Sequence, residues 1–259
     1  MRILILGGTT EASALARRVA EDRRFRPILS FAGRTTLPAP QPVPVRVGGF
    51  GGAEGLARWL GSERIEAVVD ATHPYAAQIS ANAVEACGQT GLPLATVIRP
   101  AWRPVPGDRW TEVDSARAAA DLLGRDMQPR RIFLSLGRLE LSVFAGAPRH
   151  DYLARLIEAP TGIVLPPRIS FLFQRGPFDK AAEAQLLAGE RIEALVSKNS
   201  GGTATRAKID AAREAGLPVI LIKRPEKRHD TILHDEEEAF AWLKTIADHG
   251  PKSPSRRGV

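Results

Sequence analysis

The segment DATHPYA at residues 70–76 gathers four side chains that can exchange protons or hydrogen bonds: Asp70, Thr72, His73 and Tyr75. Histidine and tyrosine are common proton donors in reductions, so His73 and Tyr75 are candidate catalytic residues. A rigid turn in which the His73 imidazole caps backbone groups is an equally good interpretation. Asp70 is more typical of a residue that orients a loop. No His, Cys or carboxylate pattern has metal-ligand spacing, and no metal is expected.

A second candidate site lies near the start of the chain, where an apolar run precedes a helical stretch. Its loop, GGTT, supplies Gly7, Gly8, Thr9 and Thr10. Backbone N–H groups and the positive end of a helix would meet there, which favours a bound phosphate. Against the fingerprint G-x-G-x-x-G/A, Gly7 and Ala12 fit, but Thr9 replaces the second glycine. Glu11 suits the helix dipole but would repel a nearby phosphate. A tight turn with a threonine cap is the alternative interpretation.

The segment SFAGRT at residues 30–35 follows the run expected to form the second strand. A site that prefers NAD carries an acidic residue there for the ribose 2′-hydroxyl. This segment has none, and its Ser30, Gly33 and Arg34 suit a 2′-phosphate, because a guanidinium presents a planar fork of donors. A solvated loop arginine is the alternative. Together with Thr72, these residues predict NADPH rather than NADH.

Basic and small residues recur at the corresponding places in the second half of the chain. Arg138 follows the apolar run at 131–136, in a loop with one glycine that would seat a pyrophosphate poorly. The segment SKNSGGT at 197–203 supplies Lys198, Asn199, Ser200, Gly201 and Gly202. We expect these residues to bind an anionic, carboxylated substrate, although each cation by itself could be a surface charge.

The elements that must position these loops are visible because the chain repeats itself. IEAVVDATHPYAAQISANAVEACGQTGLPLATVIRP (65–100) aligns with IEALVSKNSGGTATRAKIDAAREAGLPVILIKRP (192–225), and RILILGG (2–8) aligns with RIFLSLG (131–137). Each copy alternates continuous apolar runs with helical stripes, which is typical of a parallel sheet covered on both faces. We therefore predict an α/β protein with two Rossmann-like domains and parallel sheets, related by an internal repeat. Ligands are expected at the carboxyl ends of the strands, in a cleft between the domains.

The domain limits follow from the same pattern. A proline-rich linker at 99–110 is expected to separate an N-terminal NADPH-binding domain, residues 1–100, from a C-terminal substrate domain, residues 101–248. Residues 249–259 are predicted to be a disordered basic tail. The sequence leaves open which domain receives the segments that trail the two repeats, WTEVDSARAAADLL (110–123) and TILHDEEEAFAWL (231–243).

Composition sets limits on the class of protein. The 259 residues include 44% hydrophobic and 25% charged residues, which is ordinary for a globular chain. No apolar run approaches the ~20 residues that a membrane helix needs, so no membrane association is expected. The single cysteine, Cys87, is expected to be a buried thiol in a cytoplasmic protein. The net charge of +7 includes three basic residues of the tail, and no nucleic-acid partner is expected. His150, His229, His234 and His249 are expected in exposed polar surroundings, without a role.

With these motifs in view, the sequence resembles the precorrin-6A reductases of cobalamin biosynthesis. The resemblance covers about residues 1–225 and rests on four segments: ILGGTTEASALA (5–16), SFAGRT (30–35), VVDATHPYAAQIS (68–80) and VSKNSGGTATRAKIDAA (196–212). It implies NADPH-dependent reduction of a double bond of the precorrin-6A macrocycle, giving precorrin-6B, on two Rossmann-like domains. It also implies an anionic tetrapyrrole substrate and transient contact with neighbouring pathway enzymes. The branch that acts on the cobalt-containing macrocycle is not separated by these motifs.

Two other functions remain open from the residues alone. A different NADP-dependent oxidoreductase, or a sugar-nucleotide enzyme, could use the same fold, since a fold does not fix a function. A nucleotide-sensing or RNA-binding module is the last choice, because no surface of interleaved aromatic and basic residues of the kind that single strands need is apparent.

Overall fold

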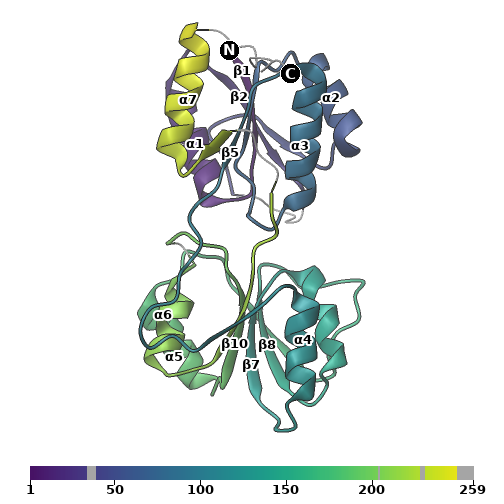
Figure 1. The fold of residues 1–259 in the computed structure, drawn as a ribbon, viewed down its shortest axis with the longest axis vertical. Coiled ribbons are helices and arrows are strands. Elements are labelled where there is room, and N and C mark those ends of the chain that lie inside the picture. Colours follow the sequence, from purple (N-terminus) through teal and green to yellow (C-terminus); the bar gives the residue numbers. More distant parts are fainter. Residues whose placement is uncertain (34–38, 204, 228–230, 250–259) are drawn as a thin grey trace, which may run out of the picture. The chain divides into compact units, whose positions relative to one another are not determined.

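The computed structural model describes residues 1–33, 39–203, 205–227 and 231–249. The chain divides into two compact units (Figure 1). Unit 1 contains residues 1–100 together with those from 226 onward, and unit 2 contains residues 101–225. Among the described helices, none combines the length and the apolar character that crossing a bilayer requires.

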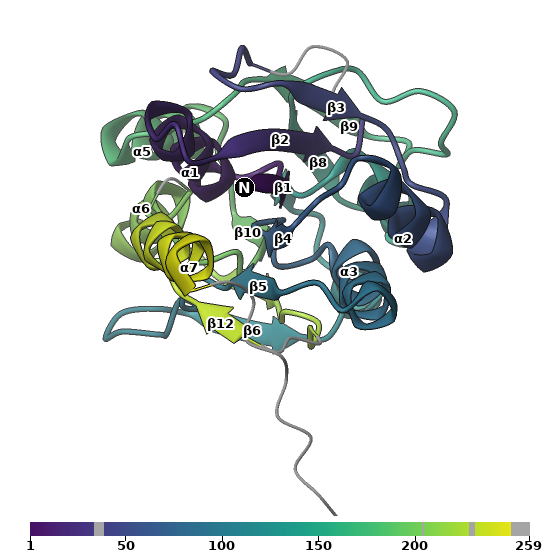
Figure 2. The ribbon, with the colours of Figure 1, turned by 90° about the horizontal axis from the view of Figure 1, so that it is seen from above.

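Unit 1 is built on a six-stranded sheet in which every neighbouring pair is parallel, in the order β12-β5-β4-β1-β2-β3. Its elements are β1 (Arg2–Leu6), α1 (Thr10–Glu21), β2 (Arg26–Phe31), β3 (Val45–Val47), α2 (Gly52–Ser62), β4 (Ala67–Asp70), α3 (Ala77–Thr90), β5 (Leu94–Val97), β12 (Thr231–Leu233) and α7 (Glu236–His249). Helices α1 and α7 cover one face of the sheet, and α2 and α3 cover the other (Figures 1 and 2).

Strand β1 shows why the apolar runs are continuous. Ile3 and Ile5 join the cluster that contains residues of α1 and α7, whereas Leu4 and Leu6 join the cluster that contains residues of α2 and α3. All four side chains are buried. A central strand with helices on both faces needs an apolar residue at every position, since successive side chains point to opposite faces.

Unit 2 repeats this architecture with the strand order β6-β11-β10-β7-β8-β9, again with parallel neighbours. Its elements are β6 (Trp110–Val113), α4 (Ala116–Arg125), β7 (Arg131–Ser135), the 3-10 helix η1 (Arg138–Gly146), β8 (Asp151–Leu156), β9 (Ile169–Phe173), α5 (Lys180–Gly189), β10 (Ala194–Lys198), α6 (Ala207–Glu214) and β11 (Val219–Ile222). The predicted α/β class and its parallel sheets are confirmed.

The internal repeat extends to single residues. Arg64 and Arg191 occupy equivalent positions before β4 and β10, and both adopt a left-handed backbone with φ of 51°. The same ion pair recurs at the amino ends of the first strands: Arg2 with Glu63 in unit 1, and Arg131 with Glu190 in unit 2. Two copies of one strand–helix plan therefore underlie the two sheets.

The segment that trails each repeat joins the sheet of the other repeat. β6 and α4 follow the first copy but belong to unit 2, whereas β12 and α7 follow the second copy but belong to unit 1. Figure 2 shows β12 beside β5 at the edge of the unit 1 sheet. Burial explains the placement, because Leu233, Ala239 and Leu243 complete the core cluster of unit 1.

The predicted C-terminal domain of residues 101–248 is therefore wrong at its end, since the chain from residue 226 belongs to unit 1. Of the predicted tail, His249 ends α7, and residues 250–259 lie outside the described part of the chain.

Candidate functional site

The loop between β1 and α1 has the backbone that its two glycines predict. The Gly7 N–H donates to Ser30 O at 2.9 Å, which continues the pairing of β1 with β2. A Cβ on Gly7 would lie 2.7 Å from Leu29 Cδ1, so this position is closely packed. Gly8 has φ of +114°, which L side chains rarely adopt, and a Cβ there would meet no heavy atom within 4 Å. The backbone is thus closely packed at Gly7, whereas space is open beside Gly8.

Thr9 caps helix α1 and ties two loops together. Its Oγ1 accepts from the Ala12 N–H at 3.1 Å and donates to Ala71 O at 2.7 Å. Both of these hydrogen bonds are made within the protein. Thr9 would therefore assist phosphate binding by holding the amino end of α1 in place. Thr10 lies exposed in the first turn, where its hydroxyl donates to Glu11 Oε2 at 3.0 Å.

The end of β4 carries a buried polar network centred on Asp70. Its Oδ1 accepts from the Thr72 N–H at 3.0 Å and from the Thr72 hydroxyl at 2.6 Å, and its Oδ2 accepts from the Ser80 hydroxyl. Lys227 Nζ lies 3.7 Å from Asp70 Oδ2 and donates to Thr72 Oγ1 at 3.0 Å. The side chains of Asp70 and Lys227 are 1% and 5% exposed. This network fixes the start of the 71–76 loop, as expected for Asp70.

His73 and Tyr75 lie on that loop, partly buried. His73 Nδ1 accepts from the Tyr75 N–H at 3.3 Å, and the two rings are 5.5 Å apart between centroids. In a neutral imidazole with Nδ1 as acceptor, the proton is on Nε2. The imidazole can therefore cap the turn through Nδ1 and carry a proton on Nε2 at the same time. From the sequence, these were two alternative interpretations.

The predicted 2′-phosphate residues fall only partly within the described structure. Ser30 is buried at the carboxyl end of β2, next to β1, and Gly33 has φ of +75°. Arg34 lies outside the described residues.

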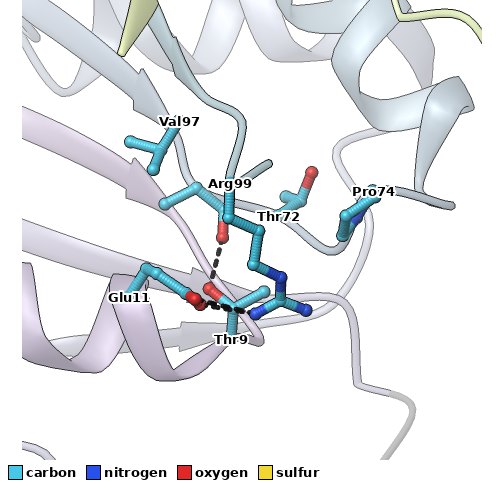
Figure 3. A pocket seen from close by; sticks show the side chains of 7 residues that line it. Thr9, Glu11, Thr72, Pro74, Val97 and Arg99 are labelled. Atoms are coloured by element: carbon cyan, nitrogen blue, oxygen red, sulfur yellow. Dashed lines mark hydrogen bonds and ion pairs between the residues drawn. The ribbon is translucent and has the colours of Figure 1, made fainter. Parts of the chain in front are cut away.

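A small pocket lies at the carboxyl ends of these strands, lined by Thr9, Glu11, Ala71, Thr72, Pro74, Val97 and Arg99 (Figure 3). Arg99 Nη1 lies 2.8 Å from both carboxylate oxygens of Glu11. Burial of Glu11 acts to raise the pKa of its carboxyl, but the hydrogen bonds and charge of Arg99 outweigh burial and lower that pKa. Arg99 therefore stabilises the charged form of the Glu11 carboxyl.

Sequence reasoning missed Arg99 and Lys227. They contact residues 88 and 155 positions away in the chain. The only signal was the Arg-Pro that ends each repeat, which shows that Arg99 has a counterpart in Arg224 but not what it contacts.

In unit 2, two of the residues predicted to bind substrate are engaged within the protein. Lys198 Nζ pairs with Glu140 Oε2 at 2.6 Å. The Asn199 side chain exchanges two hydrogen bonds with the Trp102 backbone, accepting from the N–H at 2.8 Å and donating to the carbonyl at 3.0 Å. Asn199 thus fastens the segment that enters unit 2.

The remaining residues of that prediction lie in the same loops. Ser200 is buried, with its hydroxyl 3.1 Å from Thr205 Oγ1. Gly201 and Gly202 both have positive φ, 64° and 71°. Arg138 begins η1, is partly exposed, and has no ion-pair partner among the described residues.

The other histidines divide between expectation and correction. His234 and His249 are exposed, as predicted, and His229 lies outside the described residues. The prediction for His150 is wrong, because this residue is 1% exposed. Its ring bridges two backbone groups: Nδ1 accepts from the Arg130 N–H at 3.2 Å, and Nε2 lies 2.9 Å from Leu123 O. Cys87 is buried in α3, as predicted.

A parallel sheet covered on both faces, with a glycine-containing first loop that leads into a capped helix, defines the Rossmann-like class of folds. The family model described as "Precorrin-6x reductase CbiJ/CobK" matches residues 2–244. The chain belongs to this family.

Relatives and a solved structure agree with this assignment. The Precorrin-6A reductase of Rhodobacter capsulatus is 47% identical over 96% of this chain and 97% of its own length, and that of Sinorhizobium sp is 51% identical over 86% and 85%. The structure named "CobK precorrin-6A reductase" matches with a TM-score of 0.89 and 45% identity over 100% of both chains. The Cobalt-precorrin-6A reductase of Priestia megaterium is 28% identical over 93% and 97%.

Proposed function

We propose that this chain is an NADPH-dependent oxidoreductase, acting on a CH–CH group, that reduces a double bond of the precorrin-6A macrocycle to give precorrin-6B. The observation that carries the proposal is the Gly7–Thr10 loop at the amino end of α1, in a chain whose family is named for reduction of precorrin-6x. The other functions considered from the residues, a sugar-nucleotide enzyme or a nucleotide sensor, have no such support.

The loop fits the phosphates of a dinucleotide on the geometry of its glycines. The open space above Gly8 allows a ligand to approach the backbone, and the cap at Thr9 keeps the first N–H groups of α1 directed toward it. Ser30, Gly33 and Arg34 are proposed to receive the adenosine ribose and its 2′-phosphate. A bound NADPH would supply the hydride at its nicotinamide ring.

The protein must also provide a proton for the carbon next to the one that receives the hydride. We assign this to His73, with Tyr75 as the second candidate, because both side chains can give up a proton and both lie partly buried on the loop that follows β4. The Asp70–Thr72 hydrogen bonds hold the loop that carries both residues.

The substrate side is proposed to lie on unit 2. Arg138 and the Ser200–Gly202 loop supply a cation and backbone N–H groups for the carboxylate arms of a tetrapyrrole. Lys198, which pairs with Glu140, and Asn199, which contacts the Trp102 backbone, are proposed to shape this loop for the substrate. The metal-free macrocycle is the proposed substrate, because identity to the relatives named for it is 47–51%, against 28% for the cobalt-named relative.

The proposal is tested by mixing the purified protein with precorrin-6A and NADPH under anaerobic conditions. The visible spectrum of the macrocycle is expected to change as NADPH absorbance falls in equal molar amount. The matched arm contains cobalt-precorrin-6A, for which turnover is expected to be at least about tenfold slower. An unchanged spectrum with intact NADPH would refute the reductase function.

Cofactor choice gives a separate prediction, since it depends on Arg34. NADPH is expected to bind at least about 30-fold more tightly than NADH, because a charged fork on the 2′-phosphate contributes about 2 kcal/mol. In Arg34→Ala this preference is expected to fall to about threefold or less, mainly through weaker NADPH binding. The Kd values are measured from quenching of tryptophan fluorescence. Equal affinity of the unaltered protein for both cofactors contradicts the 2′-phosphate assignment.

Localisation in the cytoplasm and brief contact with neighbouring enzymes of the pathway belong to the same proposal. A buried thiol at Cys87 is compatible with a reducing compartment.

A further inference from the structure

Glu11 presents a difficulty for a phosphate site at the amino end of α1. Its carboxylate belongs to the first turn of the helix and lines the same pocket as Thr9 and Thr72. An acidic side chain there stabilises the helix dipole, but it also places a negative charge where the phosphates of a dinucleotide would lie. The chain must offset that charge for the loop to bind them well.

Arg99 is placed to offset it. The residue follows β5, and its side chain reaches across the pocket to the first turn of α1 (Figure 3). Arg99 Nη1 lies 2.8 Å from each oxygen of Glu11, and the two side chains are only 13% and 18% exposed. At that exposure the pair is screened weakly by solvent, so each charge strongly affects the other and any ligand beside them.

We propose that Arg99 is a positioning residue for the dinucleotide, whose guanidinium neutralises Glu11 and so makes the amino end of α1 accept phosphate. This inference rests on the proposed NADPH site and adds to it a residue that contributes through Glu11. Glu11 in turn orients Arg99 and accepts from Thr10. A pair that only fastened the end of β5 to α1 would change stability without changing affinity for a charged ligand.

A double-mutant cycle on NADPH affinity separates these roles. The Kd for NADPH is measured for the unaltered protein, Arg99→Gln, Glu11→Gln and the double variant. Arg99→Gln is expected to weaken binding about 10- to 100-fold, because it leaves one uncompensated charge beside the phosphates. Glu11→Gln is expected to bind at least as well as the unaltered protein. The double variant is expected to lie within about threefold of Glu11→Gln, so that removing the carboxylate rescues the loss of the guanidinium.

Two further measurements distinguish charge from structure. The deficit of Arg99→Gln is expected to shrink between 50 mM and 500 mM salt, since salt screens the exposed phosphates of the ligand. Arg2→Gln is the matched control: it breaks an Arg–Glu pair with Glu63 at the opposite, amino end of the same sheet, and it is expected to leave the Kd unchanged. Should Arg99→Gln fail to fold by thermal melting, Arg99→Lys, which keeps the charge, is expected to bind NADPH within about threefold of the unaltered protein.

Three results would overturn the inference. An unchanged Kd in Arg99→Gln removes the role, while leaving the NADPH site intact. A deficit that persists in the double variant shows that Arg99 does not act through Glu11. If Arg99→Lys folds but binds NADPH more than about tenfold more weakly than the unaltered protein, the positive charge at position 99 is not what supports binding. Absence of NADPH binding by the unaltered protein is a different failure, because it also overturns the proposed function.

Discussion

Replacing His73 with asparagine is expected to lower kcat by about 100-fold or more, while the Kd for NADPH changes by less than about threefold. Asparagine is the informative choice because its side-chain oxygen can accept from the N–H two residues on, as His73 Nδ1 does from Tyr75. The turn is thus kept, and the imidazole that would supply the proton is lost. The measurement is the steady-state rate of precorrin-6A reduction with both precorrin-6A and NADPH saturating.

The pH dependence of kcat provides the second readout for this variant. If His73 is the proton donor, any fall in kcat with rising pH that comes from loss of the donated proton is expected to be absent in His73→Asn. Tyr75→Phe is the companion variant, expected to retain kcat within about fivefold. If His73→Asn keeps nearly full activity and Tyr75→Phe does not, the assignment of the donor is reversed.

Replacing Asp70 with asparagine is expected to destabilise unit 1 by about 3–5 kcal/mol, because it leaves the buried ammonium of Lys227 without its carboxylate. The Thr72 N–H keeps an acceptor in the Asn Oδ1, so the loss of stability comes mainly from the missing carboxylate charge. The free energy of unfolding is measured from urea titration followed by circular dichroism. The double variant Asp70→Asn with Lys227→Met is expected to recover most of the loss.

The control for this prediction is Glu214→Gln. Its partner is Lys180, and both side chains are more than half exposed, so the cost is expected to be at most about 1 kcal/mol. A change in Asp70→Asn no larger than in this control would mean that the Asp70–Lys227 pair does not stabilise unit 1.

The central strands are well predicted from the sequence because their burial on both faces shows directly in a short run of residues. A run such as ILIL or VILI is apolar at every position, and only a strand covered on both faces uses such a run at that length; these runs became β1 and β11. The loops after those strands follow from the same argument, so Gly7 and Asp70 were placed at the correct edge of the sheet.

The exchange of trailing segments could not be predicted, because the two sheets are copies. The edges at β5 and β11 offer similar apolar strands, and both trailing segments have the same strand–helix pattern. Which sheet each segment joins depends on the tertiary arrangement of the chain, and the hydrophobic periodicity of the sequence carries no information about it.

The polar partners of the site were hidden for a related reason. Residue type suggests what Arg99, Lys198 and Asn199 could bind, but not which partner in the protein competes for them. Asn199, predicted to contact substrate, meets Trp102, which is 97 positions away in the chain. Such pairs are set by tertiary packing, which a single sequence does not encode in a short window.

The exchanged edge also sets the order in which the chain can be completed during synthesis. Unit 2 is contiguous from residue 101 to 225, so all of its strands have emerged from the ribosome before β12 is made. Unit 1 begins first but cannot cover β5 until β12 and α7, at the far end of the chain, have followed. Domains usually finish folding from the amino terminus onward. Here the amino-terminal unit, which carries the Gly7–Thr10 loop, is the last to be finished, and nascent chains that stop before residue 231 leave it open along one edge.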